Sequence, residues 1–338
     1  MTAPTDRPTL DQVAERAGVG RGTVSRVING SPQVSEHTRR AVEAAVAELG
    51  YVPNLAARAL VTRRTDAVAL VISESEERVF SEPFFAGVVR GISAAVSAAG
   101  RQLVLALAAG EERPLERYLT SQHVDGVLLV SLHGDDPLPE LLRTRGLPVV
   151  LGGRPPSGYG GAYIDVDNVG GAQAGVAHLV ACGRKRIATI GGPRDMGAGQ
   201  DRLAGYRAAL AAAGLEEDPA LVVEGDFSEV SGLQAMRSLL ACHPDLDAVF
   251  AANDLMAIGA LRALRESGRR VPEDVAVVGF DDSPLSRVTD PPLSTVRQPV
   301  DEMGREMAEM LLRLISGADG DIQQSAVLPT ELVVRASS

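Results

Sequence analysis

The feature that most constrains the fold is a repeated order of short apolar runs and helical patterns that begins at Ala67. The runs, rich in Val, Ile and Leu, lie at 67–72, 102–107, 126–131, 148–152, 186–192, 248–253 and 275–282. Between them, apolar residues recur at helical spacing. Continuous apolar strands that alternate with helices are typical of parallel sheets covered by helices on both faces. We therefore expect an α/β fold.

The length of the chain adds a second constraint. A chain of 338 residues is longer than one core usually supports, so it predicts several domains. We expect a doubly wound body over 66–338 with two sheets and two lobes, one at about 66–167 with 297–320 and the other at 168–296. In such folds ligands bind beyond the carboxyl ends of the strands.

Composition excludes several classes of protein. No apolar run reaches the roughly 18 residues that a membrane-spanning helix needs. The first 30 residues carry Asp, Arg and Gly where an export signal has its apolar core, which favours a cytoplasmic protein. Cys182 and Cys242 lack the spacing of a zinc site or a disulfide framework, so we expect buried, inert thiols.

Charge separates the first 64 residues from the rest. They hold nine arginines and six acidic residues, a net charge of +3, whereas the 24 basic and 38 acidic residues after them give −14. A small basic module on an acidic body suits contact with a polyanion, although charge alone does not prove it.

The basic module has the pattern of three short helices. Thr9 and Gln12 form a capping box for a helix over 10–17 that ends at Gly18. A second helix over 21–29 follows a tight turn, and Ser35 caps a third that Gly50 closes. We expect a helix-turn-helix within 1–52; a plain three-helix bundle with solvated arginines is the alternative. The glycines at 18, 20 and 22 resemble a dinucleotide-binding loop, but no strand precedes them.

The stretches TLDQVAERAGVGRGTVSRVING (9–30) and VSEHTRRAVEAAVAELGYVPN (34–54) resemble the DNA-binding signature of the LacI/GalR repressor family. The resemblance implies that the second helix reads bases in the major groove, with the hydroxyls of Thr23 and Ser25 available for phosphate instead. The residues expected to contact DNA from this module are Thr9, Arg21, Gly22, Thr23, Ser25, Arg26 and Asn29. Gly20 and Gly22 depart from the residues that common members carry there.

Residues 53–65 form a linker that is too short for a stable isolated helix. By resemblance it is a hinge helix that orders on DNA when two subunits pair, with Asn54, Ala57 and Arg58 near the duplex. Leu60 matches the residue that family members wedge into a minor-groove step. Alternatively, Leu60 covers the core of the body.

Residues that follow the apolar runs favour a polyol ligand. Aromatic rings pack on the apolar face of a sugar, while Arg, Asn and Asp pair with its hydroxyls. The expected effector contacts are Phe84, Phe85, Met196, Arg202, Phe227, Asn253 and Asp281. Four of them, Arg202, Phe227, Asn253 and Asp281, fall on effector positions of the family. Asp167 and Asn168 lack the later Glu of a calcium loop, so we expect neither metal nor cofactor.

The resemblance is greatest to the cello-oligosaccharide-responsive repressors, in segments that include ISESEERVFSEPFFAGVVRGIS. It implies a homodimer, paired through the body near 85–95, that binds an inverted-repeat DNA operator and leaves it when a sugar binds. The segment from Glu74 to Glu82 is expected to be an acidic loop, either bordering an extended cleft or forming a solvated lid. The alternatives are a different sugar, a corepressor, an exported solute-binding protein, or an enzyme that uses Asp281 or His178 as a base.

Overall fold

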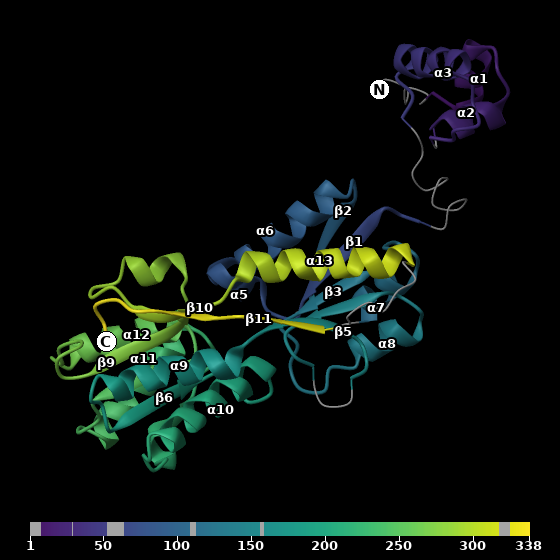
Figure 1. Ribbon diagram of the computed structural model, residues 1–338. Helices are drawn as coiled ribbons and strands as arrows, with labels where there is room; N and C mark the ends of the chain where they lie inside the picture. Colours follow the sequence, from purple (N-terminus) through teal and green to yellow (C-terminus); the bar gives the residue numbers. More distant parts are fainter. Residues whose placement is uncertain (1–7, 29, 53–63, 109–112, 156–158, 318–324) are drawn as a thin grey trace, which may run out of the picture. The chain divides into compact units, whose positions relative to one another are not determined.

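The computed structural model describes residues 8–28, 30–52, 64–108, 113–155, 159–317 and 325–338 (Figure 1). The chain divides into two compact units, Met1–Thr65 and Asp66–Ser338. None of the helices in the described ranges has both the length and the apolar character that a bilayer span requires.

The first unit, called the head below, contains three helices: α1 (Leu10–Ala17), α2 (Arg21–Ile28) and α3 (Glu36–Leu49). The predicted capping box is present, because the Thr9 hydroxyl accepts from the Gln12 amide and the Thr9 amide donates to Gln12 Oε1 over 2.8 Å. Gly18 and Gly50 end α1 and α3 with φ near +65° and +62°, a conformation that favours glycine. The predicted helix-turn-helix is confirmed.

A small core holds the three helices of the head together. Its buried members are Val13, Ala14, Val24, Val27, Val42 and Ala45. Each helix contributes two of them, and an ion pair of 2.6 Å between Arg16 and Glu48 joins α1 to α3 at the surface. The apolar face of α2 is therefore buried, and its opposite face is left for contact with a partner.

The second unit, called the body below, contains two six-stranded sheets. The first has the order β11-β5-β4-β3-β1-β2, all parallel. Its strands are β1 (Ala67–Ile72), β2 (Gln102–Leu107), β3 (Val127–Val130), β4 (Val149–Gly152), β5 (Ala162–Val166) and β11 (Ser325–Leu328). We call the part of the body built on this sheet the first lobe.

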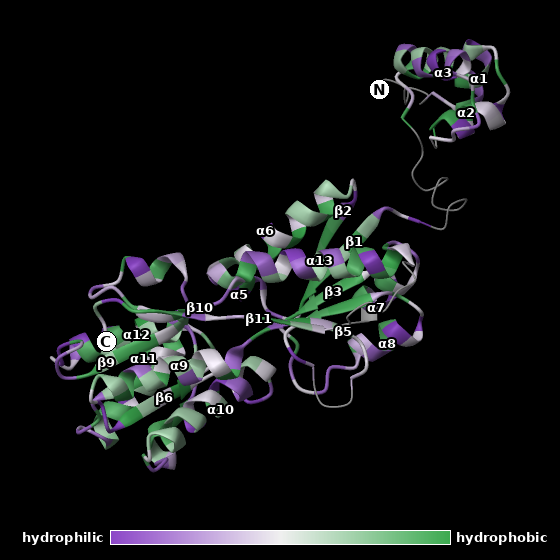
Figure 2. Ribbon diagram, in the orientation of Figure 1, coloured by the Kyte–Doolittle hydropathy of each residue, from purple (hydrophilic) through white to green (hydrophobic). Residues whose placement is uncertain are grey.

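The second lobe is built on a sheet of order β12-β10-β9-β8-β6-β7. Its strands are β6 (Ile187–Gly191), β7 (Val222–Glu224), β8 (Ala248–Ala251), β9 (Ala276–Asp281), β10 (Ser294–Arg297) and β12 (Glu331–Val333). The parallel α/β architecture is confirmed, except that β12 at the edge runs antiparallel to β10. Figure 2 shows the strands of both sheets as mainly hydrophobic.

Helices cover both faces of each sheet. In the first lobe, α6 (Pro83–Ala98) and α13 (Val300–Ser316) pack on one face, and α7 (Arg113–Thr120) and α8 (Leu138–Thr144) on the other. In the second lobe, α9 (Asn168–Ala181) and α10 (Gly197–Ala212) lie opposite α11 (Glu229–Cys242) and α12 (Asp254–Glu266). The remaining elements are α5 (Glu76–Ser81) and the 3-10 turns η1 (Pro219–Leu221) and η2 (Pro284–Arg287).

The chain passes between the lobes at three places, from β5 to α9, from β10 to α13 and from β11 to β12 (Figure 1). The last of these, near Pro329, lies beyond the predicted lobe boundaries, which end at residue 320. The ends of β5, β10 and β11 therefore lie beside any ligand site between the lobes.

Two expectations from the sequence are wrong. Glu76–Ser81 is the short helix α5 and not a loop. Cys182 and Cys242 are exposed free thiols rather than buried ones. Both cysteines stand at the C-terminal ends of helices, Cys182 as the cap of α9 and Cys242 as the last residue of α11.

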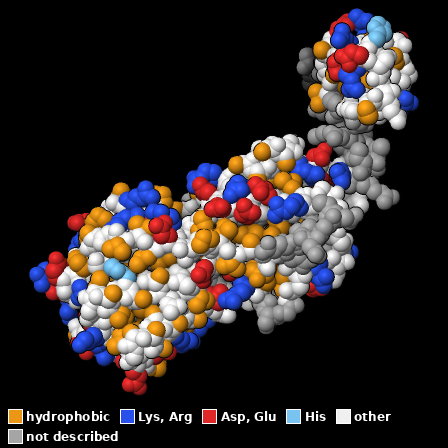
Figure 3. All heavy atoms as spheres, in the orientation of Figure 1, with side chains coloured by type: hydrophobic (Ala, Val, Ile, Leu, Met, Phe, Trp, Pro, Cys, Tyr) orange, Lys and Arg blue, Asp and Glu red, His pale blue; other side chains and the backbone are white. Residues whose placement is uncertain are grey.

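Helices α6 and α13 approach each other closely through glycines. A Cβ at Gly91 of α6 would overlap the carbonyl oxygen of Asp301, and one at Gly304 of α13 would overlap that of Val88. On its outer side, α13 carries Arg305 within 3.4 Å of three glutamates, and Figure 3 shows basic and acidic side chains interspersed there. The close approach lets the pair cover the sheet without a gap.

Replacing Gly91 with alanine is expected to destabilise the body by about 1–3 kcal/mol, since the added methyl group must displace the backbone of α13. Urea unfolding followed by circular dichroism measures the change. Gly160→Ala is the control, because the space around Gly160 is open and its φ is not in the left-handed region. Equal stability of Gly91→Ala and the control would contradict the close packing.

Candidate functional sites: the exposed face of α2 and the cleft between the lobes

A cleft of about 610 Å³ lies between the two lobes of the body. This volume is within the range of small-molecule sites, about 300–1,000 Å³. The seven residues predicted to contact a ligand all lie in its lining: Phe84, Phe85, Met196, Arg202, Phe227, Asn253 and Asp281. Because they come from both lobes, a ligand in the cleft would contact both at once.

Arg202 is the buried cation of this cleft. Its Nε donates to Asn168 Oδ1 over 2.9 Å, and one terminal nitrogen donates to the carbonyl of Ala252 over 2.6 Å and to Asp281 Oδ1 over 3.4 Å. The guanidinium carbon also lies 3.7 Å from the centre of the Phe280 ring. Burial lowers the pKa of Arg202, and the neighbouring carboxylates oppose that shift. One side chain thus fixes the ends of β8 and β9 and the start of α9.

Asp281 ends β9 in a strained conformation. Its φ is +115°, which residues other than glycine rarely adopt. Its Oδ1 accepts from Gln298 Nε2 over 2.6 Å as well as from Arg202. Burial raises the pKa of Asp281, while Arg202 opposes the shift. Strain of this kind persists where the surrounding structure enforces it, often at a binding site.

The turn after Asp281 is held by a second buried carboxylate, Asp254. It accepts from the Ser283 amide over 2.7 Å and from the Thr295 hydroxyl over 2.5 Å. Burial raises the pKa of Asp254, and the hydrogen bonds from Thr295 and Ser283 oppose the shift. The position of Asp281 therefore depends on contacts that lie behind the cleft.

Phe227 presents an aromatic ring between two cations. The guanidinium carbons of Arg78 and Arg202, from different lobes, each lie 5.8 Å from the ring centre. The backbone of Phe227 has φ +69°, and its carbonyl accepts from Asn253 Nδ2 over 2.8 Å. Asn253 also caps α12 by accepting from the Met256 amide. Asn253 therefore acts on the cleft through Phe227 and α12 as well as by lining it.

The other predicted residues differ in exposure. Phe84 is partly exposed and meets Phe85 edge to face, with ring centres 5.3 Å apart. Phe85 is only 2% exposed and belongs to the core of the first lobe, and Met196 packs in the core of the second. Phe227 is 7% exposed and belongs to the same core cluster as Met196, so Phe84 is the most exposed aromatic ring of the predicted set.

The sequence offers an extended cleft bordered by the segment from Glu74 to Glu82 as one of two alternatives, and Arg78 and Glu82 of this segment do line the cleft. No single residue of the segment was predicted as a contact. Arg78 lines the cleft, with Nε 2.6 Å from Glu82 Oε1 and a terminal nitrogen 3.1 Å from Glu74 Oε2. Glu74 and Glu82 are 8% and 9% exposed, whereas Glu76 and Glu77 between them are exposed. The segment is therefore a helix rather than a loop, with one side in the cleft wall and the other in solvent. Burial raises the pKa of Glu82 to about 7. The spacing of Glu74, Arg78 and Glu82 at intervals of four was the available signal for a helix with paired charges.

Several polar residues that line the cleft were also not predicted: Ser131, Arg154, Asp165, Asp195, Asp201 and Gln298. Asp165 accepts from Asn168 Nδ2 over 3.1 Å, and burial raises its pKa to about 6. Asp167 caps α9 by accepting from the Gly170 amide. No cluster of metal-ligating side chains occurs in the described part of the chain.

In the head, α2 presents its polar face outward. Arg21, Gly22 and Arg26 are exposed, and Thr23 and Ser25 are partly exposed. Gly20 supplies no side-chain cap, but its carbonyl accepts from the Thr23 amide over 2.8 Å. Thr9 is exposed at the start of α1, where its side chain caps that helix. Asn29 and the linker residues Asn54, Ala57, Arg58 and Leu60 lie outside the described residues.

The sequence matches two known families of protein. Residues 9–54 match the family of bacterial regulatory proteins named for lacI, and residues 176–338 match a periplasmic binding protein-like domain. CelR, an HTH-type transcriptional regulator of Thermobifida fusca, is 57% identical over 98% of both chains. The ribose operon repressor of Escherichia coli K12 is 35% identical over 98% of this chain and 99% of its own.

The chain is also similar to solved structures of transcriptional regulators. A complex of the transcriptional regulator CelR with cellobiose has a TM-score of 0.79 at 55% identity, covering 98% of this chain and all of that one. A lac repressor dimer bound to operator and the anti-inducer ONPF has a TM-score of 0.87 at 30% identity, covering 98% of this chain and 99% of that one.

The raised pKa of Glu82 predicts a pH-dependent cost of folding. Between its ordinary value of 4.5 and about 7, the folded protein binds a proton that the unfolded chain has released, so stability from this group falls as pH rises. Glu82→Gln removes that dependence. From pH 5 to pH 8, the stability of the variant relative to the parent is expected to rise by up to about 3 kcal/mol.

Urea unfolding of both proteins at several pH values measures this difference. Glu140→Gln is the control, because Glu140 is exposed and its partner Arg143 lowers its pKa. A difference between Glu82→Gln and the parent that stays constant from pH 5 to pH 8 would show that Glu82 is charged throughout.

Proposed function

The chain belongs to the lacI family of bacterial regulatory proteins, and we propose that it is a transcriptional repressor that binds operator DNA through its head and a sugar through its body. The proposed boundaries are a DNA-binding domain at 1–52, a hinge at 53–65 and an effector-binding domain at 66–338. The observation that carries the proposal is that residues predicted from both lobes line one cleft, in a chain that is 55% identical to a regulator solved with cellobiose.

The proposed DNA contacts are those of α2 with Thr9 and the hinge. Arg21 and Arg26 extend from the exposed face of α2, where an arginine can pair with both acceptors of a guanine. Gly22 keeps that face flat, so the helix can lie deep in the major groove. The lac repressor dimer on its operator supports a homodimer whose two heads read an inverted repeat.

The proposed effector is cellobiose or a longer cello-oligosaccharide. Phe227 and Phe84 would pack against the apolar faces of sugar rings, and Arg202, Asp281 and Gln298 would pair with hydroxyl groups. The cleft extends past these residues to Arg78 and Glu82 of α5, which gives a second glycosyl unit polar partners.

Release from DNA would follow from closure of the lobes. If the sugar prefers a body geometry in which the two hinges cannot pair on the operator, sugar binding and DNA binding weaken each other by the same free energy, about 1–3 kcal/mol. A corepressor that strengthens DNA binding is the alternative outcome for the same cleft.

We propose a binding protein and not an enzyme, in the cytoplasm where its operator is. The relatives named above are transcriptional regulators. Of the two candidate bases, Asp281 is engaged by Arg202 and Gln298, and His178 bonds to Ser338 outside the cleft lining.

Fluorescence anisotropy tests the proposal. An inverted-repeat DNA from upstream of the protein's own gene is titrated with the protein at fixed salt, without sugar and with cellobiose, cellotriose or monosaccharides. We expect tight binding that cellobiose or cellotriose reverses. Binding that none of these sugars changes would refute the effector, and an absence of specific binding would refute the role of the head.

Two substitutions should separate the two activities. Arg26→Ala is expected to lower operator affinity about five- to 150-fold, a loss of about 1–3 kcal/mol, with sugar binding unchanged. Arg202→Ala is expected to remove sugar binding and leave sugar-free operator binding, because the head is a separate unit with its own core. Since Arg202 is buried, Phe227→Ala is a second variant for the cleft, and thermal melting checks that each variant folds. Equal loss of both activities in every variant would contradict the modular assignment.

A further inference from the structure

His133 joins the two lobes across the cleft through a pair of carboxylates. It follows β3 in the first lobe, and its Nε2 lies 3.1 Å from Glu74 Oε1 of the same lobe. Its Nδ1 lies 3.0 Å from Oδ2 of Asp195, which follows β6 in the second lobe. The backbone amide of the next residue, Gly134, donates to the Asp195 carbonyl over 2.9 Å. Asp195 is therefore contacted by both the His133 side chain and the backbone beside it.

The two carboxylates require a particular form of the ring. A carboxylate only accepts hydrogen bonds, and a neutral imidazole has one N–H, so it can satisfy one of them. The imidazolium has two N–H groups and satisfies both. The bridge is therefore complete when His133 is protonated, and the two carboxylates raise the pKa of His133 even though partial burial opposes the shift.

We propose that His133 is a positioning residue for the effector: as an imidazolium it ties Asp195 to Glu74 and so holds the two lobes closed around the sugar. The inference rests on the proposed function of the cleft. It makes sugar affinity depend on a proton as well as on direct contacts with the sugar.

The Glu74 carboxylate also bonds to two residues that line the cleft. Besides His133, it accepts from the Ser131 hydroxyl over 2.6 Å and from Arg78 over 3.1 Å. Arg78 in turn lies beside the ring of Phe227 in the second lobe. Loss of the His133 bridge would therefore loosen α5 against the second lobe as well as Asp195.

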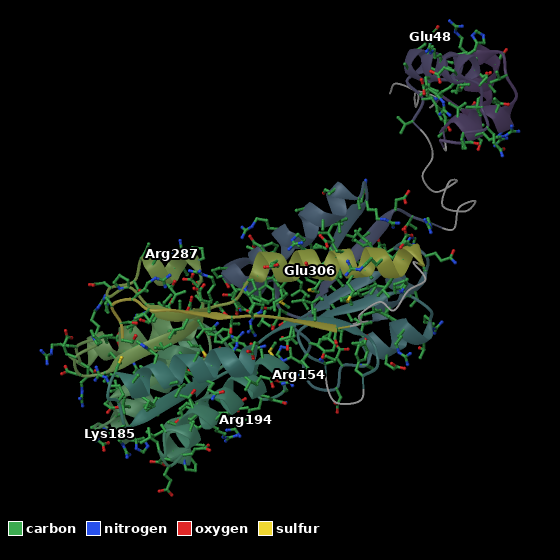
Figure 4. The ribbon with its side chains drawn as sticks, in the orientation of Figure 1. Glu48, Arg154, Lys185, Arg194, Arg287 and Glu306 are labelled. Carbon is green, nitrogen blue, oxygen red and sulfur yellow. The ribbon has the colours of Figure 1, made fainter. Side chains whose placement is uncertain are left out.

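The other charged residues described near His133 do not supply a titrating cation that could bridge Glu74 and Asp195. Arg194, next to Asp195, pairs with Glu224 at 3.2 Å, and Asp135 and Asp136 on its own loop add negative charge. Arg154, labelled in Figure 4, makes a second bridge between the lobes to Asp201, and its charge is permanent at neutral pH. Glu82 of α5 does titrate in the same range, since burial raises its pKa to about 7. Variants are needed to separate the two groups.

The direction of the pH effect follows from linkage. When the lobes open, His133 loses Asp195 and its pKa returns toward the ordinary 6.5. Closure therefore takes up protons at pH values above 6.5. Sugar affinity should be highest below that value and should fall as pH rises through the pKa of the closed form.

Calorimetric titration of the full-length protein with cellobiose between pH 5.5 and 8.5 tests this inference. We expect affinity to fall about three- to tenfold from pH 6 to pH 8, with proton uptake that is visible as a dependence of the heat on the buffer. His133→Gln should bind more weakly at pH 6 and lose most of the pH dependence, and Asp195→Asn should behave similarly. Glu82→Gln measures what Glu82 contributes to the slope.

His123→Gln is the matched control, because His123 is exposed and stacks on Tyr118 with ring centres 4.8 Å apart, outside the cleft lining. It should keep the parent's affinity and pH profile. A His133→Gln protein with the parent's affinity and slope would overturn the inference.

A second measurement does not need the sugar. The chain has five histidines, so NMR of histidine-labelled protein can follow the titration of each ring once substitutions assign the signals. We expect the midpoint of His133 above 6.5 in the parent and lower in Asp195→Asn. A midpoint at or below 6.5 that Asp195→Asn leaves unchanged would overturn the inference. Failure of cellobiose to bind at any pH, with the expected His133 titration intact, would instead refute only the proposed effector.

Discussion

A buried cation, Arg202, holds together one wall of the cleft. Burying a charge costs several kcal/mol unless partners compensate it. Here the compensation comes from Asn168, the Ala252 carbonyl, Asp281 and the Phe280 ring, which belong to different strands and helices. Because each partner must be in place for the charge to be tolerated, the ends of β8 and β9 are fixed relative to α9. The strained backbone of Asp281 and the position of Phe227 follow from that arrangement.

The two lobes meet through polar contacts, in contrast with the apolar packing inside each lobe. Within each lobe, helices pack closely through glycines and the strands bury continuous apolar runs. Between the lobes, the described contacts include His133 with Asp195, Arg154 with Asp201 and Arg78 beside Phe227. Ion pairs and cation–π contacts at a partly hydrated boundary contribute little each, so closure is a balance that a bound ligand can change.

Local signals in the sequence were reliable where structure is local. Thr9, Gln12, Gly18, Ser35 and Gly50 act within a few residues of the chain, and each has the capping role that its type and position predict. Sequence reasoning also found seven residues of the cleft lining, because the ends of parallel strands meet at one edge of a sheet. It missed α5 because a helix of six residues shows too little periodicity against a run of acidic residues. It misjudged Cys182 and Cys242 because burial at a helix end depends on what packs there.

The sequence by itself determined the α/β body, the helical head and the residue types available at the strand ends. These depend on apolar periodicity, capping and chain order, which are written in consecutive residues. Only the tertiary structure decided which charges meet within a cleft wall and which meet across the cleft. His133 and Asp195 are 62 positions apart, and Arg202 and Asp281 are 79 apart. Such pairs form when separately folded strands and loops converge, and no spacing in the sequence encodes that convergence.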